Sequence, residues 1–408
     1  MLALVNTSMF SGKADRLENG ITVLIKDDRI EAAGRDLPLP EGVHVLDLTG
    51  HFLIPGLIDA HTHLGSSSSP ERQANAGRFA TYDYGQNCSC ALAWGVTTVR
   101  SAGDYTPDIF EFRDAVDRGE IVAPRVLAAG RVFQAKDGHP GHTVYFSHPD
   151  ILSHVCIEVT DSTDIDFEVS RLVKEGADWI KAFISDDDKM NCGREIPRLS
   201  NAQLRHIVEA AHRWGKPVMM HTDDIGDMRD AALAGADTIE HTINTGTTDH
   251  EMTDELLDIL TARGTWVVPT MIATKCFDDL DPSAPHVFPA LQKAVGRMVE
   301  AGVRLGVGCD SGIPFVPYGE CEHLELELLV NAGMTPATVL RAATFGNAEM
   351  LGIGHICGTI APGLAADLVV LGKNPLADIR NTRDIRLVLR DGKVVVDRML
   401  SGEKDFQI

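Results

Sequence analysis

A regular alternation of short apolar runs and longer amphipathic segments, between about residue 53 and residue 312, constrains the fold of this chain most strongly. The amphipathic segment 202–214 follows Ser200-Asn201 and ends before Gly215, as a helix with start and stop signals does. The apolar runs are residues 52–63, 95–104, 124–133, 178–185, 217–223, 238–242, 265–271 and 304–312. Eight such strand-and-helix units predict an α/β fold in which residues 53–356 form a closed (β/α)₈ TIM barrel.

The two ends of the chain have a different pattern. Residues 1–52 contain "ITVLIKDDRIEAAG" and residues 357–408 contain "IRLVLRDGKVVVD", which are short β-rich runs broken by turn residues. Each end is too small to bury a core alone. We therefore expect residues 1–52 and 357–408 to combine into one small β-sandwich domain beside the barrel.

Composition narrows the possible partners. The formal net charge is −22, which disfavours nucleic acid and anionic membrane surfaces. The chain shows neither a signal peptide nor 18 uninterrupted apolar residues, so we expect a cytoplasmic protein without a membrane span. Its eight cysteines are scattered and are expected to be reduced thiols. A small-molecule substrate is the partner that remains.

Polar residues occur where several of the predicted strands end, which is the edge at which barrel enzymes carry their chemistry. His61 and His63 are two residues apart, so their side chains point to the same face of a strand. Neutral imidazoles are the usual ligands of zinc and similar divalent ions. The set of candidate ligands comprises His61, His63, Lys181, His221, His241 and Asp310.

Lys181 lies inside the apolar stretch "GADWIKAFISDD". With a reference pKa of about 10.4, the lysine side chain is a charged ammonium group at neutral pH. Such a charge is costly to bury. One interpretation is an ion pair with Asp310 or Asp186. The other is that the neutral amine reacts with carbon dioxide to give a carbamate, whose two oxygens can bridge two cations.

Taken together, "GLIDAHTH", the lysine strand, the two later histidines and "CDSG" resemble the metal-dependent amidohydrolase superfamily in its binuclear form. The resemblance continues through "GTIAPGLAADLVVLGKNPLADI" and so covers essentially the whole chain. Within this superfamily, the chain is most similar to the prolidase-like and imidazolonepropionase-like branch. The similarity lies in the stretches "GVTTVRSAGD", "ADWIKAF", "TIEHT" and "LELLVNAGMTPATVLRAAT".

The resemblance implies a site with two divalent ions, for which zinc is the expected metal. His61, His63 and Asp310 would hold one ion, His221 and His241 the second, and carbamylated Lys181 would bridge both. A metal-bridging hydroxide would attack an amide C–N bond of a small molecule, such as an N-acyl amino acid or dipeptide. Asp310 would act as general base and then as general acid. Relatives commonly assemble, which implies a homo-oligomer.

Further candidates come from the loop "FQAKDGHPGHTVY". His142 resembles the histidine with which related hydrolases contact the substrate carbonyl, His139 is a competing choice, and Tyr145 is a weaker substrate contact. A loop histidine that faces solvent is the alternative. Glu240 is expected to face away from the metals, and Arg100 to be an ion-pair partner inside the barrel.

Two departures from the dipeptidase-like pattern bear on the substrate. His221 is followed by Thr222-Asp223 instead of Ala-Tyr, and Asp186 follows the lysine strand where relatives have small neutral residues. Both Asp223 and Asp186 would place acid near the mouth of the barrel. A neutral or cationic amide is therefore favoured over a substrate with a free carboxylate.

Three other functions remain open. A cyclic-amide or imidazolone hydrolase would use the same ligands. A deaminase of the superfamily typically has one metal and does not need the bridging lysine. A non-catalytic scaffold would usually have lost one or more ligands, and this sequence retains the full set.

Overall fold

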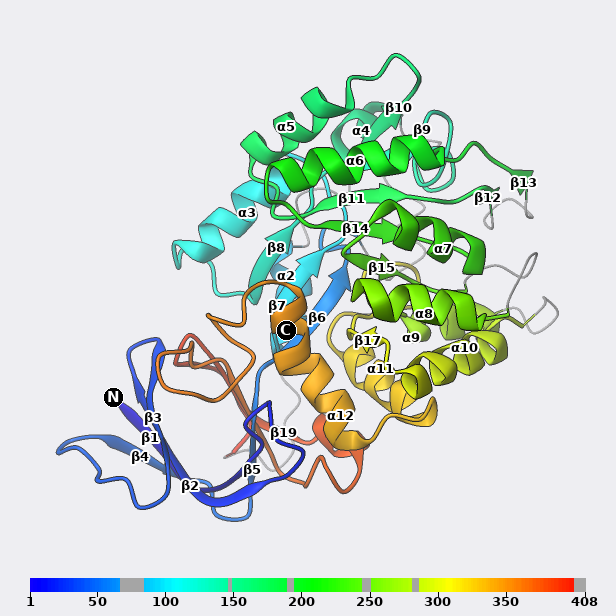
Figure 1. Ribbon diagram of the computed structural model, residues 1–408. Helices are drawn as coiled ribbons and strands as arrows, with labels where there is room; N and C mark the ends of the chain where they lie inside the picture. The colour runs from blue at the N-terminus through cyan, green and yellow to red at the C-terminus, as the bar shows by residue number, and fades with distance from the viewer. Residues whose placement is uncertain (67–83, 146–148, 189–193, 244–250, 281–285, 400–408) are drawn as a thin grey trace.

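The computed structural model describes residues 1–66, 84–145, 149–188, 194–243, 251–280 and 286–399. Parallel strands surrounded by helices make up the larger part of the molecule, and a mainly antiparallel sheet built from both ends of the chain lies beside it (Figure 1). The middle of the chain forms the larger part, and the two flanks form the sheet beside it.

The parallel strands form two sheets, and every predicted run contributes a strand. The three-stranded sheet has the order β6 (Leu57–Thr62), β7 (Val96–Ser101) and β8 (Arg125–Ala128). The seven-stranded sheet has the order β10 (Cys156–Val159), β9 (Val132–Ala135), β11 (Ile180–Phe183), β14 (Val218–His221), β15 (Thr238–Glu240), β16 (Trp266–Val268) and β17 (Arg304–Leu305). The sequence did not predict β10, which extends the sheet beyond β9.

Hydrogen bonds join the two parallel sheets at both junctions. At one junction the Asp178 N–H donates to Ala128 O at 2.8 Å, so the segment entering β11 lies beside β8. At the other, the segment after β17 runs beside β6, because Ala60 N–H donates to Val307 O at 3.0 Å and Asp310 N–H donates to His61 O at 2.8 Å. A (β/α)₈ barrel requires this pairing of its first and last strands.

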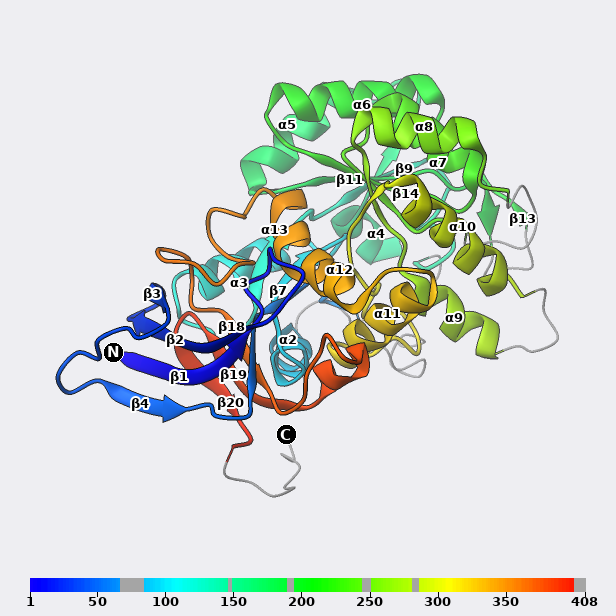
Figure 2. The ribbon, with the colours of Figure 1, turned by 60° about the horizontal axis from the view of Figure 1, so that its bottom comes forward.

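Helices cover the outside of the parallel strands (Figure 2). The predicted helix 202–214 is α6, and Ser200 and Gln203 form a capping box at its start. Gly264 ends α8 in a left-handed conformation. The helices are α2 (Tyr84–Ala93), α3 (Asp108–Asp117), α4 (Pro149–Val155), α5 (Ile165–Glu175), α6 (Asn201–Arg213), α7 (Ile225–Ala234), α8 (Asp254–Arg263), α9 (Met271–Leu280), α10 (Phe288–Ala301), α11 (Glu320–Asn331), α12 (Pro336–Arg341), η3 (Ala342–Gly346), α13 (Asn347–Met350) and η4 (Ile379–Arg383).

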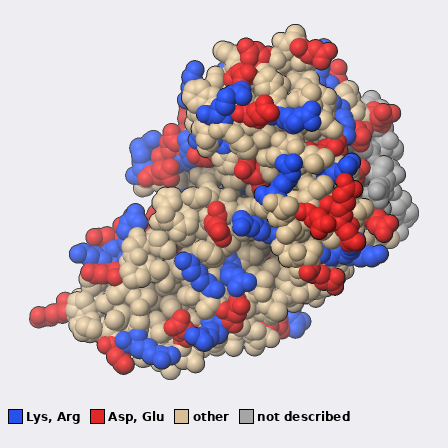
Figure 3. Space-filling model, viewed as in Figure 1, with Lys and Arg blue, Asp and Glu red and all other residues tan. Residues whose placement is uncertain are grey.

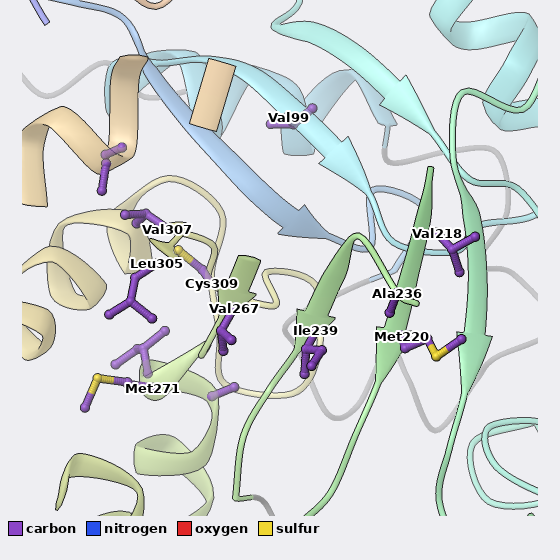
Figure 4. Packing of buried hydrophobic residues seen from close by; sticks show 14 of the residues in the cluster. Val99, Val218, Met220, Ala236, Ile239, Val267, Met271, Leu305, Val307 and Cys309 are labelled. Atoms are coloured by element: carbon purple, nitrogen blue, oxygen red, sulfur yellow. The ribbon is translucent and has the colours of Figure 1, made fainter. Parts of the chain in front are cut away.

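The strands of the larger part are buried on both faces. Met219 and Met220 are neighbours in β14, but Met220 packs in the large cluster beneath the helices, whereas Met219 packs with Ile58 and Val268 in a second cluster. Figure 4 shows Met220 with Ile239 and Val267 from the next two strands. Burial of both faces is typical of parallel strands and explains why the sequence runs are continuously apolar.

The small sheet unites the two ends of the chain. Its members are β1 (Leu2–Met9), β2 (Glu18–Lys26), β3 (Arg29–Gly34), β4 (His44–Asp47), β5 (Phe52–Pro55), β18 (Leu368–Leu371), β19 (Ile385–Arg390) and β20 (Lys393–Asp397). β5 pairs antiparallel with β18, and Phe52 lies opposite Leu371. A separate core that includes Leu4, Leu53 and Leu387 supports this sheet.

On the surface, Lys and Arg side chains lie interspersed with Asp and Glu on the face drawn in Figure 3. The excess of acid is therefore mixed with basic groups on this face. Among the described residues, no helix is long and apolar enough to cross a membrane.

Gly56 connects β5 to β6 and so links the two parts of the molecule. A Cβ atom here would lie 2.0 Å from Oγ1 and 2.5 Å from Cγ2 of Thr97, whose side chain is buried. We expect Gly56→Ala to lower the free energy of unfolding by about 1–3 kcal/mol, the usual cost of overpacking. Chemical denaturation followed by circular dichroism measures the change.

Gly85→Ala is the matched control. Gly85 lies in α2, and a Cβ atom there would meet no described atom within 4 Å. We expect this variant to be as stable as the parent or slightly more stable, because alanine favours the helix. If Gly56→Ala were equally stable, the crossing between the two sheets would not be tightly packed.

Candidate metal centre

The predicted ligands meet at the carboxyl ends of the parallel strands. His61 lies at the end of β6, and His241 directly follows β15. Their ring centroids are 4.8 Å apart, and the rings of His221 and His241 are 4.5 Å apart. One ligand atom from each of His61, His241 and Asp310 lies within 4.8 Å of the others. Strands far apart in the sequence therefore bring these groups to one point.

Three of the histidines are held through the same ring nitrogen. His61 Nδ1 lies 2.6 Å from Glu240 Oε2, and His63 Nδ1 lies 3.0 Å from Gly103 O. His241 Nδ1 lies 2.7 Å from Thr270 Oγ1. In each ring Nε2 is the nitrogen left for a ligand, which is the arrangement that metal-binding histidines usually have.

Asp310 sits between two of these rings. Its Oδ1 lies 3.3 Å from His61 Nε2 and 3.2 Å from His63 Nε2. Burial by itself would raise the pKa of Asp310, but His61, His63 and His241 hold it well below its ordinary value. Burial and the neighbouring His221 lower the pKa of His241. The site therefore combines an ionised carboxylate with a neutral imidazole.

Lys181 is fully buried in β11. Within the described part of the chain, its Nζ makes no hydrogen bond and no ion pair with Asp310 or Asp186. The Nζ atom lies over the Phe183 ring, 5.0 Å from the ring centroid. Burial lowers the pKa of Lys181 to about 8, although Glu240 and Asp310 act in the opposite direction. The ion pair considered from the sequence is thus absent from these residues.

The donor set fits a divalent cation. Among the buried side-chain polar atoms of the described residues that lack hydrogen-bond partners, three belong to the candidate ligands: His61 Nε2, Lys181 Nζ and Asp310 Oδ1. Leaving such atoms unsatisfied costs about 1–3 kcal/mol each, so a ligand is needed to account for them together. Imidazole nitrogen and carboxylate oxygen are donors that zinc accepts.

The backbone around the site is strained. His241, Thr270 and Asp310 adopt φ values of 69°, 44° and 63°, in the left-handed region that residues other than glycine rarely enter. His241 directly follows β15, Thr270 lies two residues beyond β16, and Asp310 lies five residues beyond β17. Such strain is typical of functional sites, because the surrounding structure must maintain it.

Asp223, expected to contact substrate, is buried and engaged with protein groups. Its Oδ1 lies 3.2 Å from His221 Nε2, and Ser185 Oγ donates a hydrogen bond to its Oδ2. These contacts make Asp223 a partner of His221. Asp186 is exposed, and partial burial together with Asp224 raises its pKa despite the opposing charge of Arg198.

The loop histidines are placed differently from the first expectation, which gave His142 the contact with substrate. His142 Nε2 faces two carboxylates, Asp137 at 3.3 Å and Glu158 at 3.5 Å. His139 instead lies against His221, with ring centroids 5.1 Å apart. The choice between them depends on the loop conformation, which brings His139 to the site. Tyr145 packs on a cluster that includes Phe183, whose ring stacks on His221.

Glu240 contacts His61 at the ring nitrogen opposite the one left for a ligand. Its carboxylate holds the Nδ1 of His61 and pairs with Arg100 Nη2 at 2.7 Å, so the expectation that it faces away from the metals stays a prediction. Burial would raise the pKa of Glu240, yet Arg100, His61 and Lys181 hold it at about 2. The available signal was a pair of opposite charges inside the apolar runs "TTVRS" and "TIEHT".

Comparison with known proteins shows what this chain is similar to. Ochratoxinase from Aspergillus niger is 26% identical over 412 aligned positions, covering 91% of this chain and 81% of that protein. Imidazolonepropionase from Brevibacillus brevis is 23% identical, covering 93% and 91%. The crystal structure of a Xaa-Pro dipeptidase with methionine in its active site has a TM-score of 0.80 at 24% identity, covering 96% and 99%. The last likeness supports the fold.

The resemblance seen in the strand-end residues is confirmed by a match to the Amidohydrolase family over residues 52–395. The matched region includes every candidate ligand and extends into the sheet formed by the chain ends. Because it spans most of the 408 residues, the chain belongs to the amidohydrolase family.

Proposed function

We propose that the protein is a binuclear metal-dependent hydrolase that cleaves an amide C–N bond of a small molecule. Membership of the amidohydrolase family supports an amide-bond hydrolase in general. His61, His63 and Asp310 would hold one ion, and His221 and His241 the other. Two bound divalent ions would supply water activated at neutral pH and polarise the scissile carbonyl.

The observation that carries the proposal is the buried Nζ of Lys181. It has no hydrogen-bond partner among the described residues, and it lies in a strand next to the one that ends in His221. In its neutral form the amine would bond to the carbon of CO₂ and release one proton, which leaves a carbamate. This anion would satisfy the orphaned position and offer two oxygens to two cations.

Asp310 and His139 have separate roles in the proposed reaction. Asp310 would take a proton at Oδ1 from the attacking water and return it to the leaving nitrogen. His139 lies beside His221 and would donate a hydrogen bond to the substrate carbonyl. These roles place the reacting carbonyl between the loop of His139 and the carboxyl end of β17. The eight-stranded barrel is the scaffold that we propose holds them.

The substrate class follows from charge at the mouth. Asp186 is exposed at the end of the lysine strand, and Asp224 and Asp223 act on its pKa as neighbouring negative charges. Arg198 is occupied by Asp230 at 2.9 Å and Asp227 at 3.4 Å. The charge near Asp186 at the mouth is therefore mainly negative, which favours a neutral or cationic amide as substrate.

Lys181→Ala tests the binuclear centre. We expect the parent protein to contain close to two divalent ions per chain and the variant to contain fewer. Its kcat/KM should fall by at least about 1000-fold, because several kcal/mol of transition-state stabilisation are lost with the metals. Elemental analysis and amide hydrolysis measure both effects. A parent with at most one ion, and a variant with unchanged metal and activity, would refute the bridging lysine.

His139→Ala tests the carbonyl contact, and His142→Ala is its matched control in the same loop. Loss of one donor to a developing oxyanion usually lowers kcat by about 10²–10³. We expect that loss for His139→Ala with metal content unchanged, and parent-like kinetics for His142→Ala. The reverse order of the two effects would return the role to His142.

Asp186→Asn tests the charge at the mouth, with Asp36→Asn, in the exposed bend after β3, as a control that removes the same charge elsewhere. Steady-state kinetics would compare anionic, neutral and cationic amides of one size. Unit charges about 4 Å apart in water interact by about 1 kcal/mol, so kcat/KM for cationic relative to anionic amides should fall about fivefold. An unchanged ranking would mean that Asp186 does not act on the substrate.

A further inference from the structure

We infer that Arg100 and Glu240 are positioning residues for the metal centre, and that a buried column of Trp179, Arg100 and Glu240 sets the orientation and tautomer of His61. The inference rests on the proposed function, because it takes His61 as a metal ligand. It goes further by assigning a role to two residues that touch neither metal nor substrate.

The first contact of the column is with the imidazole. Glu240 Oε2 lies 2.6 Å from His61 Nδ1, and both side chains are fully buried. An ionised carboxylate can only accept a hydrogen bond, so Nδ1 carries the proton. The lone pair is then on Nε2, the atom that lies 3.3 Å from Asp310 Oδ1. Glu240 thus decides which nitrogen can bind a cation.

Arg100 holds the carboxylate in this position. Its Nη2 donates to Glu240 Oε1 at 2.7 Å, and Thr238 Oγ1 donates to the same oxygen. Both oxygens of Glu240 are therefore engaged, which fixes its rotamer. A carboxylate buried here without Arg100 would be an uncompensated charge.

Arg100 also fixes the backbone that carries the ligand. Its Nε donates to Ala60 O at 2.6 Å, and Ala60 immediately precedes His61 in β6. The guanidinium lies over the Trp179 ring, 4.5 Å from the centroid, and this stacking limits its movement. One arginine thus anchors the strand before His61 and the group that orients the His61 ring.

This support differs from the contacts of the other candidate histidines; His221 also meets a carboxylate, that of Asp223, but through Nε2 at 3.2 Å. His63 and His241 are held by neutral groups, the Gly103 carbonyl and the Thr270 hydroxyl, whereas His61 is held by a carboxylate. A charged acceptor makes an imidazole a more basic ligand, and loss of such partners typically lowers metal affinity about 10–100-fold. We therefore assign the column to the ion bound through His61.

A double-mutant cycle separates this role from simple support of the strands. Zinc dissociation constants would be measured by competition with a chelator of known affinity, on the parent, Glu240→Gln, Arg100→Met and the double variant. We expect each single change to weaken binding of the ion held by His61 about 10–100-fold. In the Glu240→Gln background, Arg100→Met should lower zinc affinity by a smaller factor than it does in the parent, because only its contact with the Ala60 carbonyl remains to be lost.

Arg113→Met is the control. Arg113 also forms an ion pair beside the strands, with Asp178 at 2.8 Å, but it contacts no candidate ligand. It should leave the zinc dissociation constant unchanged, whatever its effect on the unfolding midpoint of the metal-free protein. Thr238→Val is a milder variant in case Arg100→Met does not fold; it removes one hydrogen bond to Glu240 and should weaken zinc binding by a smaller factor.

The outcomes distinguish two failures. If the parent binds no metal, the proposed function fails, and this inference fails with it. If the parent binds two ions and zinc affinity is unchanged in Glu240→Gln and Thr238→Val, only the positioning role is overturned. Lower stability of the metal-free variants with unchanged affinity would likewise show that the column is structural.

Discussion

The hydrogen bond from the Asp310 N–H to His61 O, 2.8 Å long, is the constraint on which the site depends. It joins the segment after β17 to β6, and so brings together residues that are 249 positions apart in the sequence. Asp59 reinforces the junction by accepting hydrogen bonds from the backbone N–H groups of His61 and Cys309, both at 3.1 Å. Without this pairing, the candidate ligands on β6 and after β17 would not face each other.

The pairing of β6 with the segment after β17 goes together with burial of several polar side chains between the parallel strands. Lys181, Arg100 and Glu240 are fully buried within a few strands of one another. Arg100 and Glu240 offset each other's charge, whereas Lys181 has no such partner among the described residues. This asymmetry distinguishes the Arg100–Glu240 ion pair from a buried amine that has no hydrogen-bond partner among the described residues.

The candidate ligands could be identified from the sequence because they stand where the predicted strands end. His61, His221 and His241 each stand where an apolar run stops, and parallel strands place all such ends at one edge. The roles of His139 and His142 could not be separated in this way. They lie in a loop, and only its folded path shows that His139 reaches His221 while His142 turns to Asp137. The contacts of Glu240 could not be predicted either, because its partners His61 and Arg100 come from distant strands.

The sequence by itself determined the alternation of strands and helices and the residue types at the strand ends, since both follow from local periodicity. It also determined the resemblance to the amidohydrolases through short contiguous motifs. The tertiary structure decided which nitrogen of His61, His63 and His241 is left for a ligand, that Lys181 Nζ has no hydrogen bond among the described residues, and that Arg100 reaches Glu240. Those features depend on side chains from separate strands meeting in the interior, which no local pattern specifies.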